Sequence, residues 1–313
     1  MVDAGVLSDI SRLQRTLAAG EFAVTAEITP PVAGVPEPLC AMAAPLKGRV
    51  DAVNVTDGPR ARVHMSALAA AAILLADGVE PVLQVTCRDR NRIALQADLL
   101  GASALGIRNL LLMRGDDPGE GEGGEPPATP VFDMESADLM AIAVAMRDRG
   151  VLPSGRAIAP PPSLFIGAAE MPVEPKEGWA PTRTAEKIAS GAQFFQTQLC
   201  YDIGLVRRWA ARLVDAGLTQ RAAVLLGTGP VGSARSARWM RDNLYGVVVP
   251  DAVIERLEKA SDPVAEGIRM CADFIAELRE MRGIAGVHLM APGNARAIPQ
   301  VLDLCGRTGQ GVG

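Results

Sequence analysis

The chain has 313 residues, of which 49% are hydrophobic and 21% are charged, and its formal net charge is −5. The apolar fraction excludes a disordered chain, and the acidic balance argues against nucleic-acid binding, which usually needs a basic face. Because no uninterrupted apolar run reaches roughly 18 residues and residues 1–20 do not resemble a signal peptide, we expect a cytoplasmic protein that binds neither nucleic acid nor membrane.

Short apolar runs alternate with segments of helical periodicity along the chain. Residues 1–20 predict an extra helix that precedes this pattern. Eight strands are then predicted, over 22–29, 50–56, 80–87, 108–113, 163–169, 193–199, 222–228 and 285–290. Helical periodicity is clear over 65–78, 90–106, 133–150, 183–192, 201–217, 233–244 and 264–283.

This alternation favours an α/β fold, a single (β/α)8 TIM barrel, over an open doubly wound sheet. The first strand is not followed by GxGxxG, and GxxxxGK[ST] is absent, so the usual nucleotide-binding signatures of open sheets are missing. We predict an N-terminal extra helix over 1–20 and a barrel catalytic domain over 21–313, with long loops at 115–131 and 152–162 and no domain linker.

Histidine is scarce and cysteine is scattered, which limits the possible chemistry. The five Cys lack CxxC spacing and predict buried free thiols rather than disulfides or a zinc site. The only two His are His64, expected in a turn before a helix, and His288, expected to be a satisfied core residue. We assign neither a chemical role. A Ser-His-Asp triad is thus disfavoured, and proton transfer is expected from a carboxylate.

Glu27 is the first candidate, because active sites of such barrels lie at the carboxyl ends of the strands. Strand alternation places Thr25 and Glu27 on one face and the bulkier Val24 and Ile28 on the other, which suits the helix layer. Glu27 therefore points into the barrel. Burial disfavours the ionised carboxylate, which suits a general acid. The alternative is a salt bridge to an Arg of a neighbouring strand.

Polar residues also follow the second and third strands. Thr56 and Asp57 form a polar turn that either contacts a ligand or caps a loop. Gln84 and Thr86 share one face of the third strand, which we expect to point inward. Arg88 lies beyond the end of that strand.

The fourth and sixth strands supply further candidates. After the fourth strand, Gly115 separates Arg114 from Asp116. The two charged side chains either contact a polar ligand or form an ion pair where the long loop begins. Gln196 and Gln198 share a face, and a heterocycle with alternating donors and acceptors would satisfy their amides. For Lys187, in the preceding helix, an ordinary surface position is favoured over a phosphate contact.

Several of these segments resemble the methylenetetrahydrofolate reductase family. They are AEITPP, VNVTDGP, VTCRDRN, LGIRNLLLMRGDDP, KIASGAQFFQTQ and GVHLM, so the resemblance extends from about residue 20 to 305. The RDRN and GIRNLLLMRGD stretches particularly resemble the reductase halves of bacterial homocysteine methyltransferase fusions. The resemblance implies a flavin-containing (β/α)8 barrel that interconverts 5,10-methylenetetrahydrofolate and 5-methyltetrahydrofolate, with FAD as hydride carrier.

The resemblance also assigns roles to residues. Glu27 matches the acid that opens the methylene adduct to an iminium. Asp116 matches a carboxylate near the flavin pyrimidine and the pterin, where it would tune the flavin potential, and Gln198 matches an amide that holds folate. The implied cofactor-binding set comprises Thr56, Asp57, Gln84, Arg114, Gly115, Asp116, Ser136, Arg183 and Lys187.

Five positions depart from the family pattern. Gln84 replaces a flavin-contacting His, Met171 and Glu135 stand where tyrosines are expected, and Arg183 replaces an amide side chain. Ala234 lacks an aromatic ring that stacks on nicotinamide or folate, a loss of about 1 kcal/mol. Flavin contacts are thus altered, and the use of NADH or NADPH as electron donor stays open.

The leading hypothesis is an FAD-dependent folate oxidoreductase, which can run in the methyl-oxidising direction and serve one-carbon metabolism, including methionine biosynthesis. A second is a partner-dependent or flavin-free folate-binding barrel, and a third is an unrelated barrel lyase that uses Glu27 on a carbonyl substrate. Besides tetrahydrofolate as substrate, we expect a homo-oligomer and consider an electron-transfer or methyltransferase partner.

Overall fold

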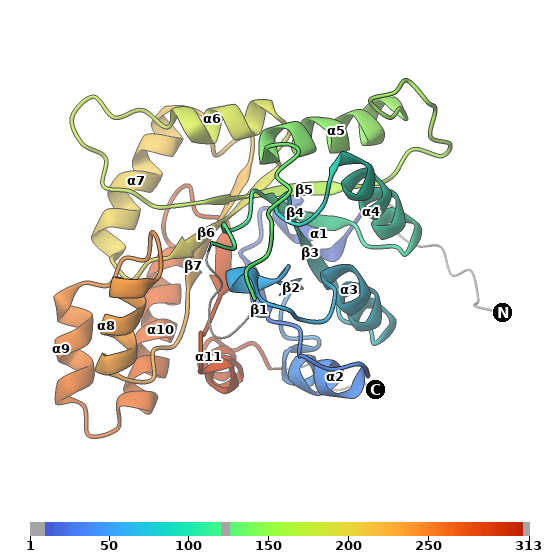
Figure 1. Ribbon diagram of the computed structural model, residues 1–313. Coiled ribbons are helices and arrows are strands. Elements are labelled where there is room, and N and C mark those ends of the chain that lie inside the picture. Colours follow the sequence, from blue (N-terminus) through green and yellow to red (C-terminus); the bar gives the residue numbers. More distant parts are fainter. Residues whose placement is uncertain (1–9, 120–125, 309–313) are drawn as a thin grey trace.

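The computed structural model describes residues 10–119 and 126–308, and its centre is a closed barrel of eight parallel strands in sequence order (Figure 1). The barrel closes where β1 pairs with β8, with Ala23 opposite Gly286. The predicted (β/α)8 barrel is therefore confirmed, as are all eight predicted strands. They are β1 (Ala23–Ile28), β2 (Ala52–Val55), β3 (Pro81–Thr86), β4 (Asn109–Met113), β5 (Phe165–Glu170), β6 (Phe194–Leu199), β7 (Ala223–Thr228) and β8 (Gly286–Leu289).

Helices surround this barrel, and each predicted helix after residue 21 is present. They are α3 (Ala67–Ala76), α4 (Arg92–Ala104), α5 (Ser136–Arg149), α6 (Thr182–Ala189), α7 (Ile203–Asp215), α8 (Ala234–Asn243) and α10 (Pro263–Arg279). Within the described residues, three further α-helices were not predicted: α2 (Glu37–Ala43), α9 (Asp251–Lys259) and α11 (Ile298–Leu304). Across the described parts of the chain, every helix is too short or too polar to span a bilayer.

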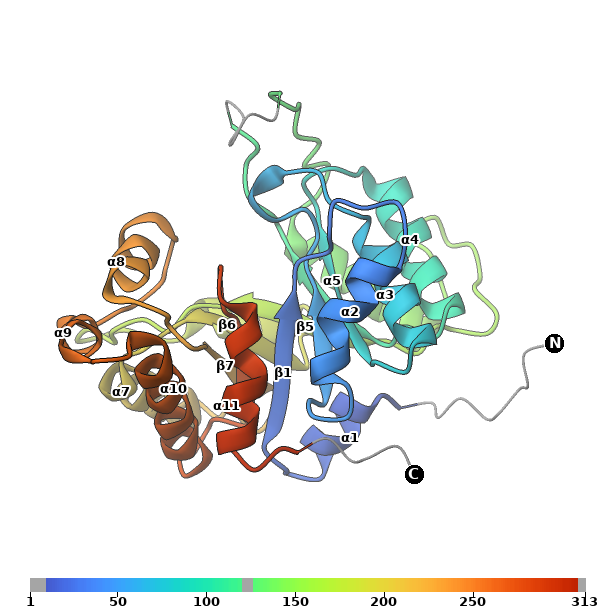
Figure 2. The ribbon, with the colours of Figure 1, turned by 90° about the horizontal axis from the view of Figure 1, so that it is seen from below.

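The predicted N-terminal helix is present as α1 (Arg12–Ala18), which lies at the end of the barrel where β1 begins (Figure 2). The Ser11 hydroxyl caps it by accepting a hydrogen bond from the Gln14 N–H. The Glu80 carboxylate, just before β3, accepts from the backbone N–H groups of Arg12 and Leu13 at 2.6 and 2.9 Å. Residues 1–9 of the predicted helix lie outside the described residues, and a boundary at residue 20 stays a prediction.

Inward-pointing side chains fill the barrel in layers. The layer next to α1 is apolar, and within it the rings of Phe165 and Phe194 stack with centroids 4.9 Å apart. A Cβ on Gly167 would lie 2.3 Å from the Phe194 ring, so only glycine fits beside it. The residues of this layer are Leu13, Ala23, Ala52, Val82, Leu111, Phe165, Phe194 and Leu225.

The five cysteines are all free, as predicted, but only Cys87, Cys200 and Cys271 are buried, so the expectation of burial is wrong for Cys40 and Cys305. Burial raises the pKa of Cys87 to about 11 and that of Cys200 to about 12. Cys40 and Cys305 are both partly exposed, but burial also raises the pKa of Cys305. At about pH 8 we expect a thiol reagent such as Ellman's reagent to modify Cys40 first and the buried thiols only after denaturation. Mass mapping of the labelled peptides checks this. Rapid labelling of Cys200 in the native protein would contradict the burial described.

Candidate active site at the barrel mouth

Glu27 lies at the carboxyl end of β1 and points into the barrel, as predicted. Its Oε2 accepts a hydrogen bond from the Gln84 amide of β3 at 3.2 Å and lies 3.7 Å from Nε2 of His288 on β8. The Glu27 side chain is 26% exposed, so it can reach a ligand. Among the described residues Glu27 forms no ion pair with an Arg, and the alternative of an Arg salt bridge is not supported.

His288 is buried, with Nδ1 3.0 Å from the Thr25 hydroxyl. It is a satisfied interior residue, as predicted, but it also adjoins the candidate acid. The sequence carries no signal for this proximity, because β1 and β8 are at opposite ends of the chain. Their pairing places Thr25 opposite His288.

Two buried amides form the floor of the site. The side chains of Asn54 and Gln196 exchange hydrogen bonds of 2.6 and 2.9 Å, and the Gln196 amide also donates to Thr25 at 3.0 Å. The expectation that a bound heterocycle satisfies Gln196 is therefore wrong, because its partners come from the protein. Thr56 follows Asn54 on the inward face of β2, and its buried hydroxyl has no partner among the described residues. A ligand at the mouth would satisfy it.

Asp57 secures the loop that follows β3. Its Oδ2 accepts from the N–H and hydroxyl of Thr86 at 2.9 and 3.0 Å and pairs with Arg90. Arg90 also pairs with Asp98 at 2.7 Å. The turn at Thr56 and Asp57 was expected either to contact a ligand or to cap a loop. The contacts of Asp57 favour loop capping. The predicted role of Asp57 in cofactor binding stays a prediction.

The turn after β4 packs against the turn after β3. Gly115 has φ +87°, and a Cβ there would lie 2.9 Å from the Thr86 side chain, so glycine is required by contact with the protein. The buried Arg88 side chain forms a two-pronged ion pair with Asp89 at 2.8 and 2.6 Å. This hydrogen bonding raises the pKa of Arg88, and the charges of Asp57 and Asp116 add to the effect. Asp116 is itself exposed, so it is available to a ligand.

Arg114 contacts Phe132 and Glu135. Its guanidinium lies over the Phe132 ring, 3.9 Å from the centroid, and its Nε is 3.6 Å from Glu135. Glu135 is the N-cap of α5 and Ser136 is the first residue of that helix. Arg114 thus has an ion pair at the loop root, but with Glu135 rather than with Asp116.

Lys187 on α6 is partly buried and paired, so its interpretation as an ordinary surface lysine is wrong. Its Nζ donates to the Ala169 carbonyl at 2.6 Å and to Glu170 at 3.2 Å. The Glu170 side chain, 11% exposed, also accepts from the Thr184 hydroxyl and the Met171 N–H, both at 3.1 Å. The Glu170 carboxylate therefore already lies beside Lys187 Nζ, where an anionic ligand would otherwise bind. Arg183, on the same helix, is exposed.

The contacts of Lys187 bear on whether FAD can bind to the residues that the family resemblance implies. The diphosphate of FAD needs cationic or N–H donors that are not already neutralised. At Lys187 a diphosphate would meet the Glu170 carboxylate, and like charges repel. The arrangement at Lys187 therefore does not fit FAD, although the Thr56 hydroxyl, which has no partner among the described residues, and the exposed Asp116 are available to a ligand.

Gln198 lies at the end of β6, where its amide bonds to backbone groups. It donates to the Tyr245 carbonyl at 3.1 Å and accepts from the Leu199 N–H at 2.9 Å. Tyr245 belongs to the connection between α8 and α9. A folate contact from Gln198 would require these bonds to be exchanged, and its role stays a prediction.

An aromatic residue that the sequence analysis missed lies on α8. Ala234 begins this helix without a ring, but Trp239, 42% exposed, carries the Arg60 guanidinium 5.0 Å from its ring centroid. Arg60 follows β2 and has φ 57°, an uncommon conformation for a non-glycine residue. Trp239 lies on the helix that follows β7, and Arg60 lies in the segment that follows β2. Between β7 and β2 in the closed barrel are β8, which carries His288, and β1, which carries Glu27. The contact therefore joins segments on either side of these two strands.

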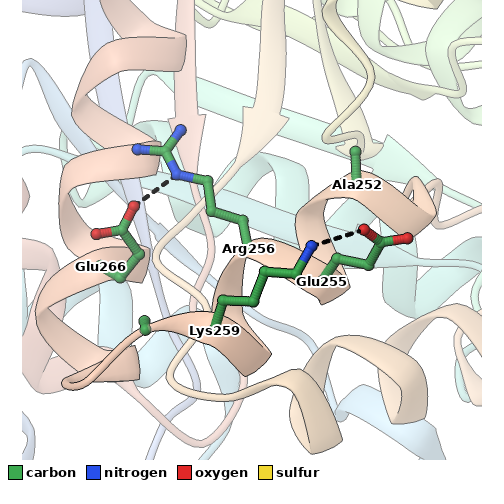
Figure 3. A pocket seen from close by; sticks show the side chains of 6 residues that line it. Ala252, Glu255, Arg256, Lys259 and Glu266 are labelled. Atoms are coloured by element: carbon green, nitrogen blue, oxygen red, sulfur yellow. Dashed lines mark hydrogen bonds and ion pairs between the residues drawn. The ribbon is translucent and has the colours of Figure 1, made fainter.

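A separate hollow of about 430 Å³ lies on the outer helices α9 and α10 (Figure 3). Its charged side chains pair with one another: Arg256 with Glu266 at 2.5 Å and Lys259 with Glu255 at 3.2 Å. None of the candidate residues lines it. The barrel mouth therefore remains the candidate site.

Comparison with known proteins agrees with the resemblance found in the motifs. The family model of methylenetetrahydrofolate reductase matches residues 12–148 and 166–306. Methylenetetrahydrofolate reductase 1 of Schizosaccharomyces pombe is 24% identical over 254 residues, which are 73% of this chain and 36% of that protein. A probable methylenetetrahydrofolate reductase (NADPH) of Caenorhabditis elegans is 24% identical over 255 residues, 78% of this chain and 35% of that protein. The chain thus spans about a third of the length of these relatives.

A solved structure with the same fold comes from Clostridium thermocellum. It is an uncharacterized protein that binds two copies of 5-methyl-5,6,7,8-tetrahydrofolic acid. The two folds superpose with a TM-score of 0.64 at 13% sequence identity, over 95% of this chain and 100% of the other. At that identity the likeness supports the fold alone.

Proposed function

The chain belongs to the methylenetetrahydrofolate reductase family, and we propose that it is an oxidoreductase that interconverts 5,10-methylenetetrahydrofolate and 5-methyltetrahydrofolate at the barrel mouth. The observation that carries the proposal is Glu27. Its carboxylate is directed inward at the mouth, is partly exposed, accepts a hydrogen bond from Gln84 and lies 3.7 Å from Nε2 of His288. The Clostridium thermocellum protein of the same fold binds 5-methyl-5,6,7,8-tetrahydrofolic acid, a ligand of the substrate class proposed for this chain.

Glu27 supplies the proton in this proposal. In the reducing direction it protonates the bridged adduct, the ring C–N bond breaks, and the resulting iminium carbon accepts hydride. In the oxidising direction hydride leaves the methyl carbon, the ring closes, and the Glu27 carboxylate takes the proton back. FAD as hydride carrier stays a prediction, and NADPH, named for the Caenorhabditis elegans relative, is the first external donor to test.

A second candidate is a flavin-free or partner-dependent folate-binding barrel. The pairing of Lys187 with Glu170 favours it, because the cation implied for flavin binding is already neutralised within the chain. A homo-oligomer and an electron-transfer or methyltransferase partner remain predictions.

The absorption spectrum of the purified protein, followed by anaerobic turnover assays, tests both candidates. Assays in each direction, with and without added FAD, NADH and NADPH, measure 5-methyltetrahydrofolate formed or consumed. Turnover that requires FAD supports the flavin-dependent enzyme, and turnover without flavin supports the flavin-free form. Absence of folate turnover under every condition, in protein that binds 5-methyltetrahydrofolate, would contradict the proposed oxidoreductase and leave the binding barrel.

Glu170→Gln tests the charge conflict at Lys187. Removing the carboxylate charge should tighten FAD binding about tenfold, which corresponds to about 1.4 kcal/mol, because Lys187 is no longer neutralised. Titration followed by quenching of flavin fluorescence measures the dissociation constant. Glu174→Gln is the matched control, since Glu174 pairs with Arg208 on the exposed surface. Equal FAD affinity in Glu170→Gln and the unmodified protein would refute the conflict.

A further inference from the structure

His288 and Glu27 belong to one network of side chains inside the barrel. From Glu27 the network runs to His288, then to Thr25, and then to the amides of Gln196 and Asn54. These residues come from β1, β2, β6 and β8, so the network ties together strands from all around the barrel. All except Glu27 are buried.

Hydrogen bonding within the network assigns the proton on His288. The Gln196 Nε2 group only donates, and it reaches the Thr25 oxygen at 3.0 Å and lies 3.4 Å from His288 Nδ1. Thr25 accepts that bond, and the nearest acceptor for its own hydroxyl proton is Nδ1 at 3.0 Å, compared with 3.4 Å for the Val287 carbonyl. Both amide hydrogens of Gln196 are taken by Thr25 and by Asn54 Oδ1 at 2.9 Å, so the Thr25 hydroxyl is the donor to Nδ1. The neutral imidazole then carries its proton on Nε2, the nitrogen that lies 3.7 Å from Oε2 of Glu27.

Both contacts of the Glu27 carboxylate involve the same oxygen. Gln84 Nε2 lies 3.2 Å from Oε2, and His288 Nε2 lies 3.7 Å from Oε2. Gln84 donates a hydrogen bond to Oε2, whereas His288 Nε2 lies just beyond hydrogen-bond distance of the same oxygen. The other oxygen, Oε1, is left to hold the proton and give it to a ligand at the mouth.

We infer that His288 is a positioning residue for the acid: its Nε2–H, 3.7 Å from Oε2 of Glu27, closes to a hydrogen bond as Glu27 gives up its proton and stabilises the carboxylate that remains. The inference rests on the proposed function for the role of Glu27 and assigns His288 a part in the same step. A carboxylate in a largely buried position needs such donors when it ionises. Gln84 alone would supply a single bond.

Histidine-selective ¹⁵N NMR tests the arrangement in ligand-free protein, independently of turnover. The chain has only two histidines, so two imidazoles are observed, and His64→Gln identifies the signals of His288. We expect the shifts of His288 at neutral pH to show a proton on Nε2. Glu27→Gln should displace the His288 Nε2 signal and leave His64 unchanged, because the Nδ1 contact of His64 is the Pro30 carbonyl at 2.9 Å. A proton on Nδ1, or a His288 signal indifferent to Glu27→Gln, would overturn the inference.

Kinetics of two His288 variants supply the second test. His288→Leu removes the donor and should lower kcat at least about tenfold, the scale of a lost hydrogen bond to a charged group, with folate KM little changed. His288→Gln, whose amide can replace the Nε2–H donor, should recover most of kcat, and His64→Gln should keep full activity. Equal loss in His288→Gln and His288→Leu would refute the donor role. Absence of turnover in the unmodified protein would instead refute the proposed function, while the NMR result would stand.

Discussion

Glu27→Gln is expected to reduce folate turnover at least ~100-fold, the usual contribution of a general acid, while folate binding changes little. The amide is nearly isosteric and can still contact Gln84, but it cannot donate and recover a proton at the substrate nitrogen. Its effect should therefore fall on kcat, because the proton is needed in the transition state and not for binding.

Steady-state rates with 5-methyltetrahydrofolate, together with equilibrium binding of the same compound, measure this separation. Glu21→Gln is the matched control, since Glu21 is exposed two residues before β1 and lies outside the site. Turnover of Glu27→Gln equal to that of Glu21→Gln would remove Glu27 from catalysis. A parallel loss of folate binding would show that Glu27 holds the substrate rather than protonating it.

Phe194→Ala is expected to lower the free energy of unfolding by about 3–5 kcal/mol, the range for truncating a buried aromatic residue. Phe194 is fully buried, stacks on Phe165 and fills the space beside Gly167. Its neighbours are held by the closed barrel, so they cannot collapse fully into the cavity.

Urea unfolding followed by circular dichroism measures the loss as a shift of the midpoint at unchanged slope. Tyr245→Ala is the control, because Tyr245 is also aromatic but 84% exposed, and its truncation should change stability by no more than about 0.5 kcal/mol. A loss below about 1 kcal/mol in Phe194→Ala would mean that the layer next to α1 can repack and is not a rigid base for the site.

The elements of the fold could be predicted because their signals are local. Strand alternation placed Glu27 on the inward face, and the same alternation put Val24, Ala26 and Ile28 against the helices, as observed. The family motifs are also local, and the family they indicated is confirmed. Length does not explain why the helix α9, with 9 residues, was not predicted, since α6, with 8 residues, was predicted.

Partners within the site could not be predicted, because they are distant in sequence. The approach of Thr25 to His288 joins residues 263 positions apart, and only closure of the barrel brings them together. Gln196 illustrates the consequence: the sequence showed that its amide needed partners, but not that Asn54 on the opposite side of the barrel supplies them.

The sequence by itself therefore determined the barrel, the family and the inward carboxylate of Glu27, since period, turn residues and motifs are properties of neighbouring residues. Only the tertiary structure decided which charges are already neutralised. It paired Lys187 with Glu170 and placed His288 next to Glu27. The physical reason is that the availability of a charge depends on which groups lie within a few ångströms, and strand closure sets those distances.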